Sequence, residues 1–266
     1  LNEDNWLNAA WGIMTTDTRA KAASEQLVID GQRVTLTGIS KGAGMIMPNM
    51  ATMLGYVATD AVIDQALLQQ WMSDATERSF NRITVDGDTS TNDSCTVVAT
   101  GASGVVIEAQ SEAADQFIAA FNRIMLELAQ LIVRDGEGAT KFVEIRVDQA
   151  ASSEEALDVA YTIAHSPLVK TALFASDPNW GRILACVGRA GLKDLDLNAL
   201  TIFLGDVCIV ENGGRAQAYT EEAGQTIMNR EEILIHVVLN RGSHSETVWT
   251  TDLSKEYVAI NADYRS

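Results

Sequence analysis

The chain has 266 residues, of which 47% are hydrophobic and 21% are charged, and these values are typical of a folded globular protein rather than a disordered one. Its 36 acidic and 19 basic residues give a formal net charge of −17, which disfavours nucleic acid and anionic membranes as partners. The 3 cysteines are too widely spaced for a disulfide framework and no apolar run reaches the ~18 residues of a membrane span, so a cytoplasmic location is expected.

In the first part of the chain, hydrophobic spacing and turn residues predict an alternation of helices and strands. The dipeptide Asp30-Gly31 is the best hairpin signal, because it suits a two-residue turn between strands. The expected elements are a helix over 2–14, a hairpin over 25–40, a strand over 52–58, a helix within 59–80 that begins after a cap at Thr59 or Asp60, and two strands around a polar loop within 82–104.

The rest of the chain predicts a similar mixture, which places the protein in the α/β class with layered sheets and helices. The glycine-rich loop 101–104 is a candidate boundary between lobes. The expected elements are a helix over 111–133, a strand over 141–150, a helix over 152–166, a helix within 176–191 capped by Ser176 or Asp177, strands near 199–204, 206–210, 232–239 and 245–250, and a short helix with a tail within 252–266.

Several common kinds of site are disfavoured by residue spacing. The acidic run 86–93 opens like a calcium loop, but it lacks the glycine and the glutamate that such a loop needs at its sixth and twelfth positions. The 3 histidines lack the spacing of zinc ligands, and neither a G-x-S-x-G elbow nor a Walker-type glycine loop is present. No metal and no cofactor is therefore predicted.

The apolar segment KGAGMIMPNMATML, residues 41–54, contains Lys41, Pro48 and Asn49, which a buried strand would not favour, and also an Ala-Thr step. An internal threonine is a poor nucleophile because it needs an adjacent base. If the chain breaks between Ala51 and Thr52, the new α-amine, with a pKa of ~8, lies on the same residue as the hydroxyl and can take its proton. Cleavage would begin with attack of the Thr52 hydroxyl on the Ala51 carbonyl, and water would hydrolyse the resulting ester. The alternative is an ordinary Ala-Thr step in a strand.

The same segment resembles the self-cleavage signature of the ornithine acetyltransferase (glutamate N-acetyltransferase) family. The resemblance implies an αββα sandwich like that of N-terminal-nucleophile enzymes with a smaller second lobe. It also implies division of the chain into 1–51, the end of an α chain, and 52–266, a β chain. Further similar segments are IMTTDT (13–18), VDGDTSTNDS (85–94), DGEGATK (135–141), SDPNWGRI (176–183), GDV (205–207) and NADYRS (261–266).

By this resemblance, Thr52 is both the cleavage residue and the nucleophile. It would accept an acetyl group from N-acetylornithine and pass it to glutamate, a reaction of arginine biosynthesis. Lys41 suits the α-carboxylate that both substrates carry, and Glu137 suits an amino group of ornithine. The implied substrate contacts are Thr15 (with Thr16 a near-equal candidate), Lys41, Thr52, Glu137, Asn261 and Ser266, and the residues expected to brace the site through loop hydrogen bonds are Asp86, Asp88, Thr89 and Asn92.

The resemblance also implies partners beyond this chain. Family members carry a further amino-terminal region with a Thr-Gly pair that forms the oxyanion hole, and no counterpart precedes Leu1. The cleaved chains are expected to form a heterotetramer of two α and two β chains. Three alternatives stay open: a bifunctional enzyme that also uses acetyl-CoA, an amidohydrolase or aminopeptidase of the same fold, and an inactive relative that serves as a binding subunit.

Overall fold

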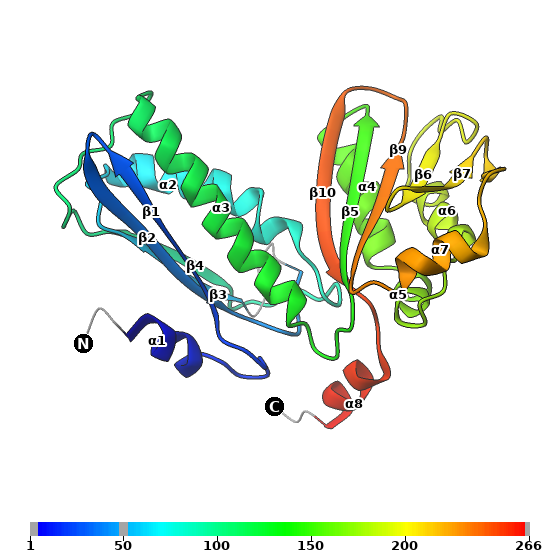
Figure 1. Cartoon of the computed structure of the whole chain (residues 1–266), viewed down its shortest axis with the longest axis horizontal. Helices are drawn as coiled ribbons and strands as arrows, with labels where there is room; N and C mark the ends of the chain where they lie inside the picture. The colour runs from blue at the N-terminus through cyan, green and yellow to red at the C-terminus, as the bar shows by residue number, and fades with distance from the viewer. Residues whose placement is uncertain (1–4, 48–52, 264–266) are drawn as a thin grey trace. The chain divides into compact units, whose positions relative to one another are not determined.

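The computed structural model describes residues 5–47 and 53–263, which form two compact units, Leu1–Gly136 and Glu137–Ser266 (Figure 1). The α/β class expected from the sequence is confirmed, because each unit contains one sheet with helices packed on it. The loop 101–104 is not the boundary between the units. Gly101 and Ser103 donate their N–H groups to the carbonyls of Ala61 and Asp60, and the loop lies well inside the sequence range of the first unit.

The first unit contains a four-stranded sheet in the order β1-β2-β3-β4. The first three strands are antiparallel neighbours, whereas β3 and β4 run parallel. The elements are α1 (Trp6–Gly12), β1 (Lys21–Ile29), β2 (Gln32–Lys41), β3 (Leu54–Thr59), α2 (Gln65–Glu77), the 3-10 helix η2 (Phe80–Arg82), β4 (Ser94–Ala99) and α3 (Glu112–Arg134).

The predicted hairpin is confirmed as β1 and β2. Asp30 and Gly31 form its turn with φ angles of 50° and 74°, the left-handed conformation that a tight hairpin turn requires. Ile29 pairs with Gln32 directly across this turn, which sets the register of the whole ladder as far as Lys21 and Ser40.

The long predicted helix is confirmed as α3, which packs against β1 and β2. Its N-cap Ser111 accepts the Ala114 N–H, and one face of the helix is buried along its length. By length and composition α3 could cross a membrane. Its buried face, which includes Phe117, Phe121 and Leu128, instead forms part of the core of this unit.

Two expectations for the first unit are wrong in detail. The cap of α2 is Asp64, whose carboxylate accepts the N–H groups of Ala66 and Leu67; Thr59 and Asp60 end the preceding strand region instead. The first strand expected within 82–104 does not form in the structure of that segment. The segment begins with the 3-10 helix η2, and no strand follows it in the described residues 83–93 before β4. The polar residues between η2 and β4 bond to neighbouring loops, as Asp86 does to the N–H of Met45.

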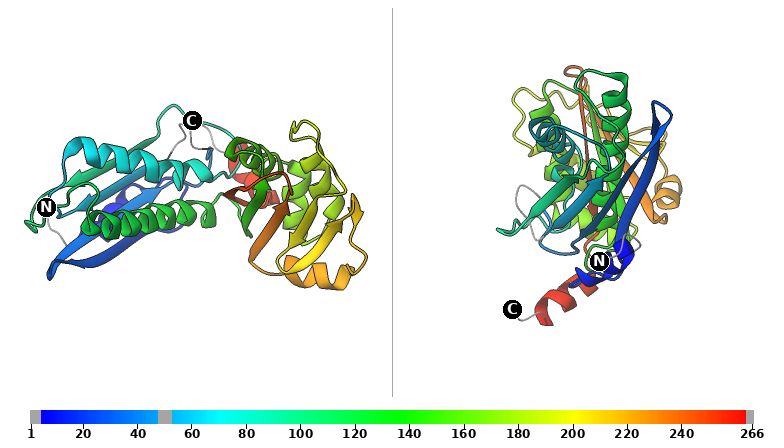
Figure 2. Two further views of the ribbon diagram at one scale, coloured as in Figure 1. Left: turned by 90° about the horizontal axis from the view of Figure 1, so that it is seen from above. Right: turned by 90° about the vertical axis from the view of Figure 1, so that its left-hand side faces the viewer.

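The second unit contains a six-stranded sheet in the order β10-β5-β9-β6-β7-β8, in which β5 and β9 run parallel (Figure 1). Figure 2 shows the ribbon of the same unit from two further sides. The helix α4 packs on β5 and β10. The elements are β5 (Phe142–Ala150), α4 (Ser153–Ala164), α5 (Pro167–Phe174), α6 (Trp180–Gly188), β6 (Thr201–Leu204), β7 (Val207–Glu211), β8 (Gly214–Arg215), α7 (Glu221–Met228), β9 (Glu232–Val238), β10 (His244–Thr251) and α8 (Lys255–Asp263).

Sequence reasoning missed three elements of this unit: α5, α7 and β8. The cap of α6 also differs from the expectation, because Asn179 accepts the Arg182 N–H, whereas Ser176 and Asp177 lie before the helix. Inward-facing aliphatic side chains of β5, β6 and β9 form one core with α4, α5 and α6.

Candidate functional site

Two of the predicted substrate contacts meet in the first unit. The Lys41 ammonium, at the end of β2, lies 3.5 Å from the Thr15 hydroxyl, in the loop between α1 and β1. Lys41 is 7% exposed, and Thr15 is exposed. A nearly buried ammonium beside an accessible hydroxyl is suited to binding a carboxylate, because both groups can donate hydrogen bonds to it. This contact favours Thr15 over Thr16.

The nucleophile predicted from the sequence follows this strand in the chain. Lys41 pairs with Leu54 at the start of β3, and Leu54 is two residues beyond Thr52 in the sequence. Ala51 and Thr52 lie outside the described residues, as does Ser266.

The loop 83–93 holds the chain on both sides of the segment that contains the predicted cleavage site. Asp86 accepts the N–H groups of Met45 at 2.7 Å and Ile46 at 3.1 Å. Asp93 accepts the Met53 N–H at 2.5 Å, and Ser94 donates its N–H to the Met53 carbonyl at 3.1 Å. The bracing role expected of Asp86 is therefore consistent with its contacts, while Asp93 was not foreseen.

Asp93 occupies an unusual environment for a carboxylate. One oxygen accepts the Met53 N–H, and the other is enclosed without a hydrogen-bond partner among the residues that the structure describes. Burial raises the pKa of Asp93 to about 6, although the Met53 N–H and the positive charge of Lys41 both lower it. This carboxyl group can therefore change its charge close to neutral pH, beside the residue that follows Thr52.

Asp17 is a second carboxylate that sequence reasoning missed. It accepts the N–H of Thr15 at 3.1 Å and that of Gly42 at 2.7 Å. Thr15 is itself a predicted substrate contact, and Gly42 directly follows the other one, Lys41. Burial alone would raise the pKa of Asp17, but the Gly42 N–H, the Lys21 ammonium and the Thr15 N–H together keep that pKa below its usual value. Its place in the quoted TTDT segment was the available signal.

Two further predicted contacts meet in the second unit. The Asn261 side-chain amide, on α8, donates to a Glu137 carboxylate oxygen at 2.8 Å. The same amide donates to the Tyr257 carbonyl at 3.0 Å, which fixes its direction on the helix. Both Asn261 and Glu137 are accessible, so these groups can exchange this contact for one with a ligand.

Asp252 ties the segment around Glu137 to the segment before α8. Its carboxylate accepts the N–H and hydroxyl of Thr140 at 2.8 and 2.6 Å and the N–H of Lys141 at 2.9 Å. Gly138 lies directly against α8 with a φ of 66°, where a Cβ would come within 2.5 Å of the Tyr257 nitrogen. The glycine therefore permits the close approach that brings Glu137 to Asn261.

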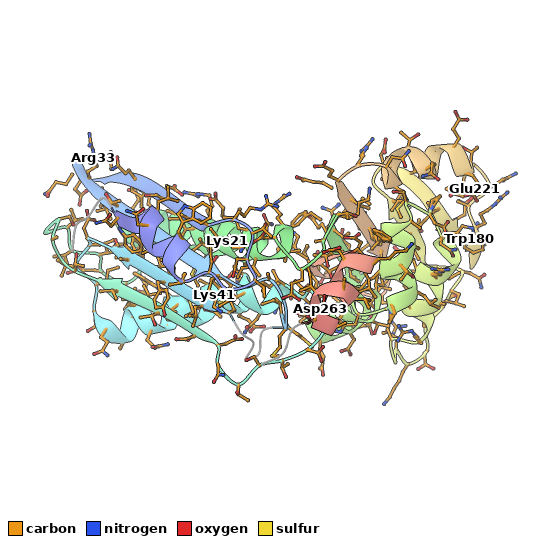
Figure 3. The ribbon with its side chains drawn as sticks, turned by 90° about the horizontal axis from the view of Figure 1, so that it is seen from below. Lys21, Arg33, Lys41, Trp180, Glu221 and Asp263 are labelled. Carbon is orange, nitrogen blue, oxygen red and sulfur yellow. The ribbon has the colours of Figure 1, made fainter. Side chains whose placement is uncertain are left out.

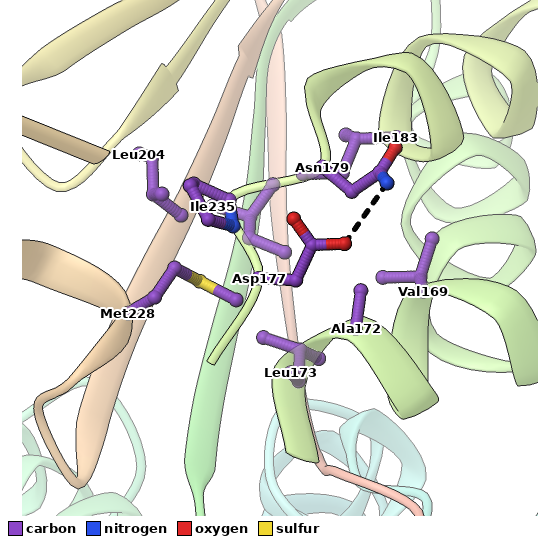
Figure 4. A pocket seen from close by; sticks show the side chains of 10 residues that line it. Val169, Ala172, Leu173, Asp177, Asn179, Ile183, Leu204, Met228 and Ile235 are labelled. Atoms are coloured by element: carbon purple, nitrogen blue, oxygen red, sulfur yellow. Dashed lines mark hydrogen bonds between the residues drawn. The ribbon is translucent and has the colours of Figure 1, made fainter. Parts of the chain in front are cut away.

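The SDPNWGR segment braces the second unit rather than presenting reactive groups. The Asn179 amide donates to the Asp177 carboxylate at 3.0 Å, at the edge of a small hollow between α5, α6 and the sheet (Figure 4). Most of the lining is aliphatic: Val169, Ala172, Leu173, Ile183, Leu204, Met228 and Ile235. The acidic run 86–93 likewise directs carboxylates at backbone amides, and no cluster of three potential metal ligands occurs within residues 5–47 and 53–263.

Comparison with known proteins gives one consistent result. A model of the ArgJ family matches residues 2–266. The chain is 58% identical to the "Arginine biosynthesis bifunctional protein ArgJ" of Pseudomonas fluorescens (strain Pf0-1) and 57% identical to the protein of that name from Psychrobacter arcticus. Each match includes 100% of this chain and 66% of the relative, so the chain spans slightly less than two thirds of these relatives.

A solved structure agrees with these sequence matches. The crystal structure of the arginine biosynthesis bifunctional protein ArgJ from Bacillus halodurans matches with a TM-score of 0.76 and 39% sequence identity. The match covers 80% of this chain and 100% of that one. At this identity the likeness extends to sequence as well as to fold.

Proposed function

Because the chain belongs to the ArgJ family, we propose that it is part of an acetyltransferase that moves an acetyl group from N-acetylornithine to glutamate in arginine biosynthesis. The family match over residues 2–266, together with the Ala51-Thr52 step inside the segment 41–54, carries this proposal. The names of the relatives refer to arginine biosynthesis and agree with it.

The proposed reaction has two steps with Thr52 as nucleophile. After cleavage at Ala51–Thr52, the free α-amine takes the hydroxyl proton while the oxygen attacks the acetyl carbonyl of N-acetylornithine. The C–N bond breaks, ornithine leaves with a proton, and an acetyl-threonine ester remains. The amine of glutamate then attacks this ester, which gives N-acetylglutamate and restores the hydroxyl. This route needs no cofactor.

The remaining site residues have proposed roles that follow from their chemistry. Lys41 and Thr15 bind the α-carboxylate common to donor and acceptor, since their ammonium and hydroxyl lie together at the end of β2. Glu137 and Asn261 bind polar groups of the substrate in the second unit, and Ser266 is a further proposed contact. We further propose a cytoplasmic enzyme that assembles from two α and two β chains.

The word "bifunctional" in the relatives' names favours one second candidate, an enzyme that also takes acetyl groups from acetyl-CoA. Assays of the complete polypeptide separate the candidates. Acetyl transfer to glutamate from N-acetylornithine alone supports the first, transfer from both donors supports the second, and acetate release without glutamate supports a hydrolase.

Mass spectrometry of the denatured complete protein tests the cleavage step. We expect two polypeptides, one of which begins at Thr52. Thr52→Ala should give a single uncut chain without transferase activity, because it lacks the nucleophile, whereas Thr52→Ser should retain part of both activities. An alanine variant that still cleaves and transfers would contradict the mechanism.

A further inference from the structure

Lys21 is a buried cation that the proposed reaction does not use. It is the first residue of β1 and is 0% exposed, and its position relative to Lys41 can be followed in Figure 3. Its ammonium lies 2.5 Å from an oxygen of Asp17 and 2.5 Å from an oxygen of Asp135. Burying three ionisable groups is costly unless they pair closely, and the two short ion pairs of Lys21 meet that condition.

Asp135 connects the cluster to the end of α3. It is the C-cap residue of that helix and is 4% exposed. Its carboxylate accepts the Thr18 hydroxyl, and the N–H groups of Thr18 at 3.0 Å and Arg19 at 3.4 Å. Asp135 therefore fixes the end of the loop that begins at Thr15.

Asp17 connects the cluster to the substrate contacts. The oxygen that accepts from Lys21 also accepts the Gly42 N–H, and the other oxygen accepts the Thr15 N–H. Gly42 directly follows Lys41 in the chain. The carboxylate thus holds the backbone on both sides of the contact between the Lys41 ammonium and the Thr15 hydroxyl.

We propose that Lys21, with Asp17 and Asp135, is a positioning residue for the carboxylate subsite formed by Lys41 and Thr15. Lys21 holds Asp17 in place, and Asp17 sets the spacing between the loop that carries Thr15 and the end of β2 that carries Lys41. This inference rests on the proposed function, because it concerns the same substrates. It predicts that loss of the Lys21 charge weakens substrate binding rather than the chemical steps at Thr52.

The structure provides a matched control for removal of Lys21. Arg123 of α3 pairs with Glu25 of β1, so this exposed ion pair joins the same two segments of chain as the buried pair of Lys21 with Asp135. Lys21→Met removes the cation that links β1 with the end of α3, and Arg123→Met removes the cation that links β1 with the middle of α3. Only the first should affect the subsite.

The test is the kinetics of acetyl transfer by the complete polypeptide with N-acetylornithine and glutamate as probes. For Lys21→Met we expect KM for both substrates to rise by about 10- to 100-fold, with a smaller change in kcat, because the subsite is displaced while Thr52 is retained. Arg123→Met should keep both constants within about twofold of the wild type, as is usual for an exposed ion pair.

Asp17→Asn is the second variant, and it tests the positioning role even if Lys21→Met does not fold. The asparagine keeps the size of the side chain but can no longer accept from Lys21, Gly42 and Thr15 together. We expect the same rise in KM, accompanied by normal cleavage at Ala51–Thr52.

The outcomes distinguish the inference from the function on which it rests. A wild-type protein that transfers no acetyl group would contradict the proposed function. An active wild type with folded Lys21→Met and Asp17→Asn variants that match Arg123→Met in KM would overturn the positioning role. A fall in thermal stability without a rise in KM would likewise assign the cluster to structure alone.

Discussion

Single carboxylates determine much of the local geometry in the first unit, and they do so through backbone amides. Asp17, Asp86 and Asp93 each accept from a residue that is distant in the sequence or in another loop. Asp93 and its partner Met53 are 40 residues apart. No local pattern predicts such a pairing, which explains why the role of Asp93 was not predicted from the sequence.

The pKa of Asp93 predicts a specific dependence of stability on pH. The folded protein holds this proton more tightly than the unfolded chain does, since the pKa is about 6 instead of 3.8. Wild-type stability therefore falls as the pH rises from about 4 to about 6, relative to a variant without this ionisation. Asp93→Asn imitates the protonated carboxyl and keeps an acceptor for the Met53 N–H.

We expect Asp93→Asn to raise the melting temperature relative to the wild type at pH 7.5 by more than at pH 4, as measured by thermal denaturation across this range. The control is Asp64→Asn, because Asp64 is the N-cap of α2 and is far in the sequence from the loop that contains Asp93. A difference between wild type and Asp93→Asn that is constant with pH would contradict the raised pKa.

At the scale of elements, prediction succeeded where the pattern is long or the turn chemistry is distinctive. The Asp30-Gly31 hairpin is an example of distinctive turn chemistry, because both turn residues have a positive φ. The helix α3 is an example of a long pattern, because its buried face repeats over 23 residues. The missed helices α5 and α7 have only 8 residues each, too short for a clear period. Their caps, Ser166 and Thr220, were the available signals.

The contact of the Glu137 segment with α8 predicts the effect of a small substitution. Gly138→Ala should displace α8 and with it Asn261, because the new methyl group would lie 2.5 Å from the Tyr257 nitrogen and 2.6 Å from the Ser254 hydroxyl. We expect KM for N-acetylornithine to rise by about tenfold or more in the transferase assay.

Gly191→Ala is the matched control for Gly138→Ala. Gly191 also has a positive φ, 84°, but a Cβ there would meet no atom within 4 Å. This variant has the backbone strain without the steric contact, so it should lose stability and keep its KM. Equal KM values for the two variants would show that the close approach of Gly138 to α8 does not serve substrate binding.

At the scale of the whole chain, the net charge of −17 carried by these 266 residues opposes the approach of an anion such as glutamate, the proposed acceptor. Glutamate carries a net charge of −1, whereas N-acetylornithine is a zwitterion without net charge. Raising the ionic strength from 0.01 to 0.15 M shortens the Debye length from ~30 to ~8 Å and screens the long-range repulsion of glutamate. The proposed contact of a carboxylate with Lys41 would be short-range and common to both proposed substrates.

We therefore expect kcat/KM for glutamate to rise about twofold or more over this range of salt, while kcat/KM for N-acetylornithine changes less. Steady-state kinetics at several sodium chloride concentrations would measure this, with potassium glutamate excluded as the added salt. A fall for both substrates would mean that attraction by local cations outweighs the overall field.

The strand order of the first sheet has a consequence for the cut chain. The predicted cleavage site lies between β2 and β3, and these two strands are antiparallel neighbours from Leu36–Thr59 to Lys41–Leu54. Scission there removes one covalent bond and none of the hydrogen bonds of this ladder. The two products would then be complementary halves of one β-sheet, with β1 and β2 from one polypeptide and β3 and β4 from the other, and they could separate only by unfolding together.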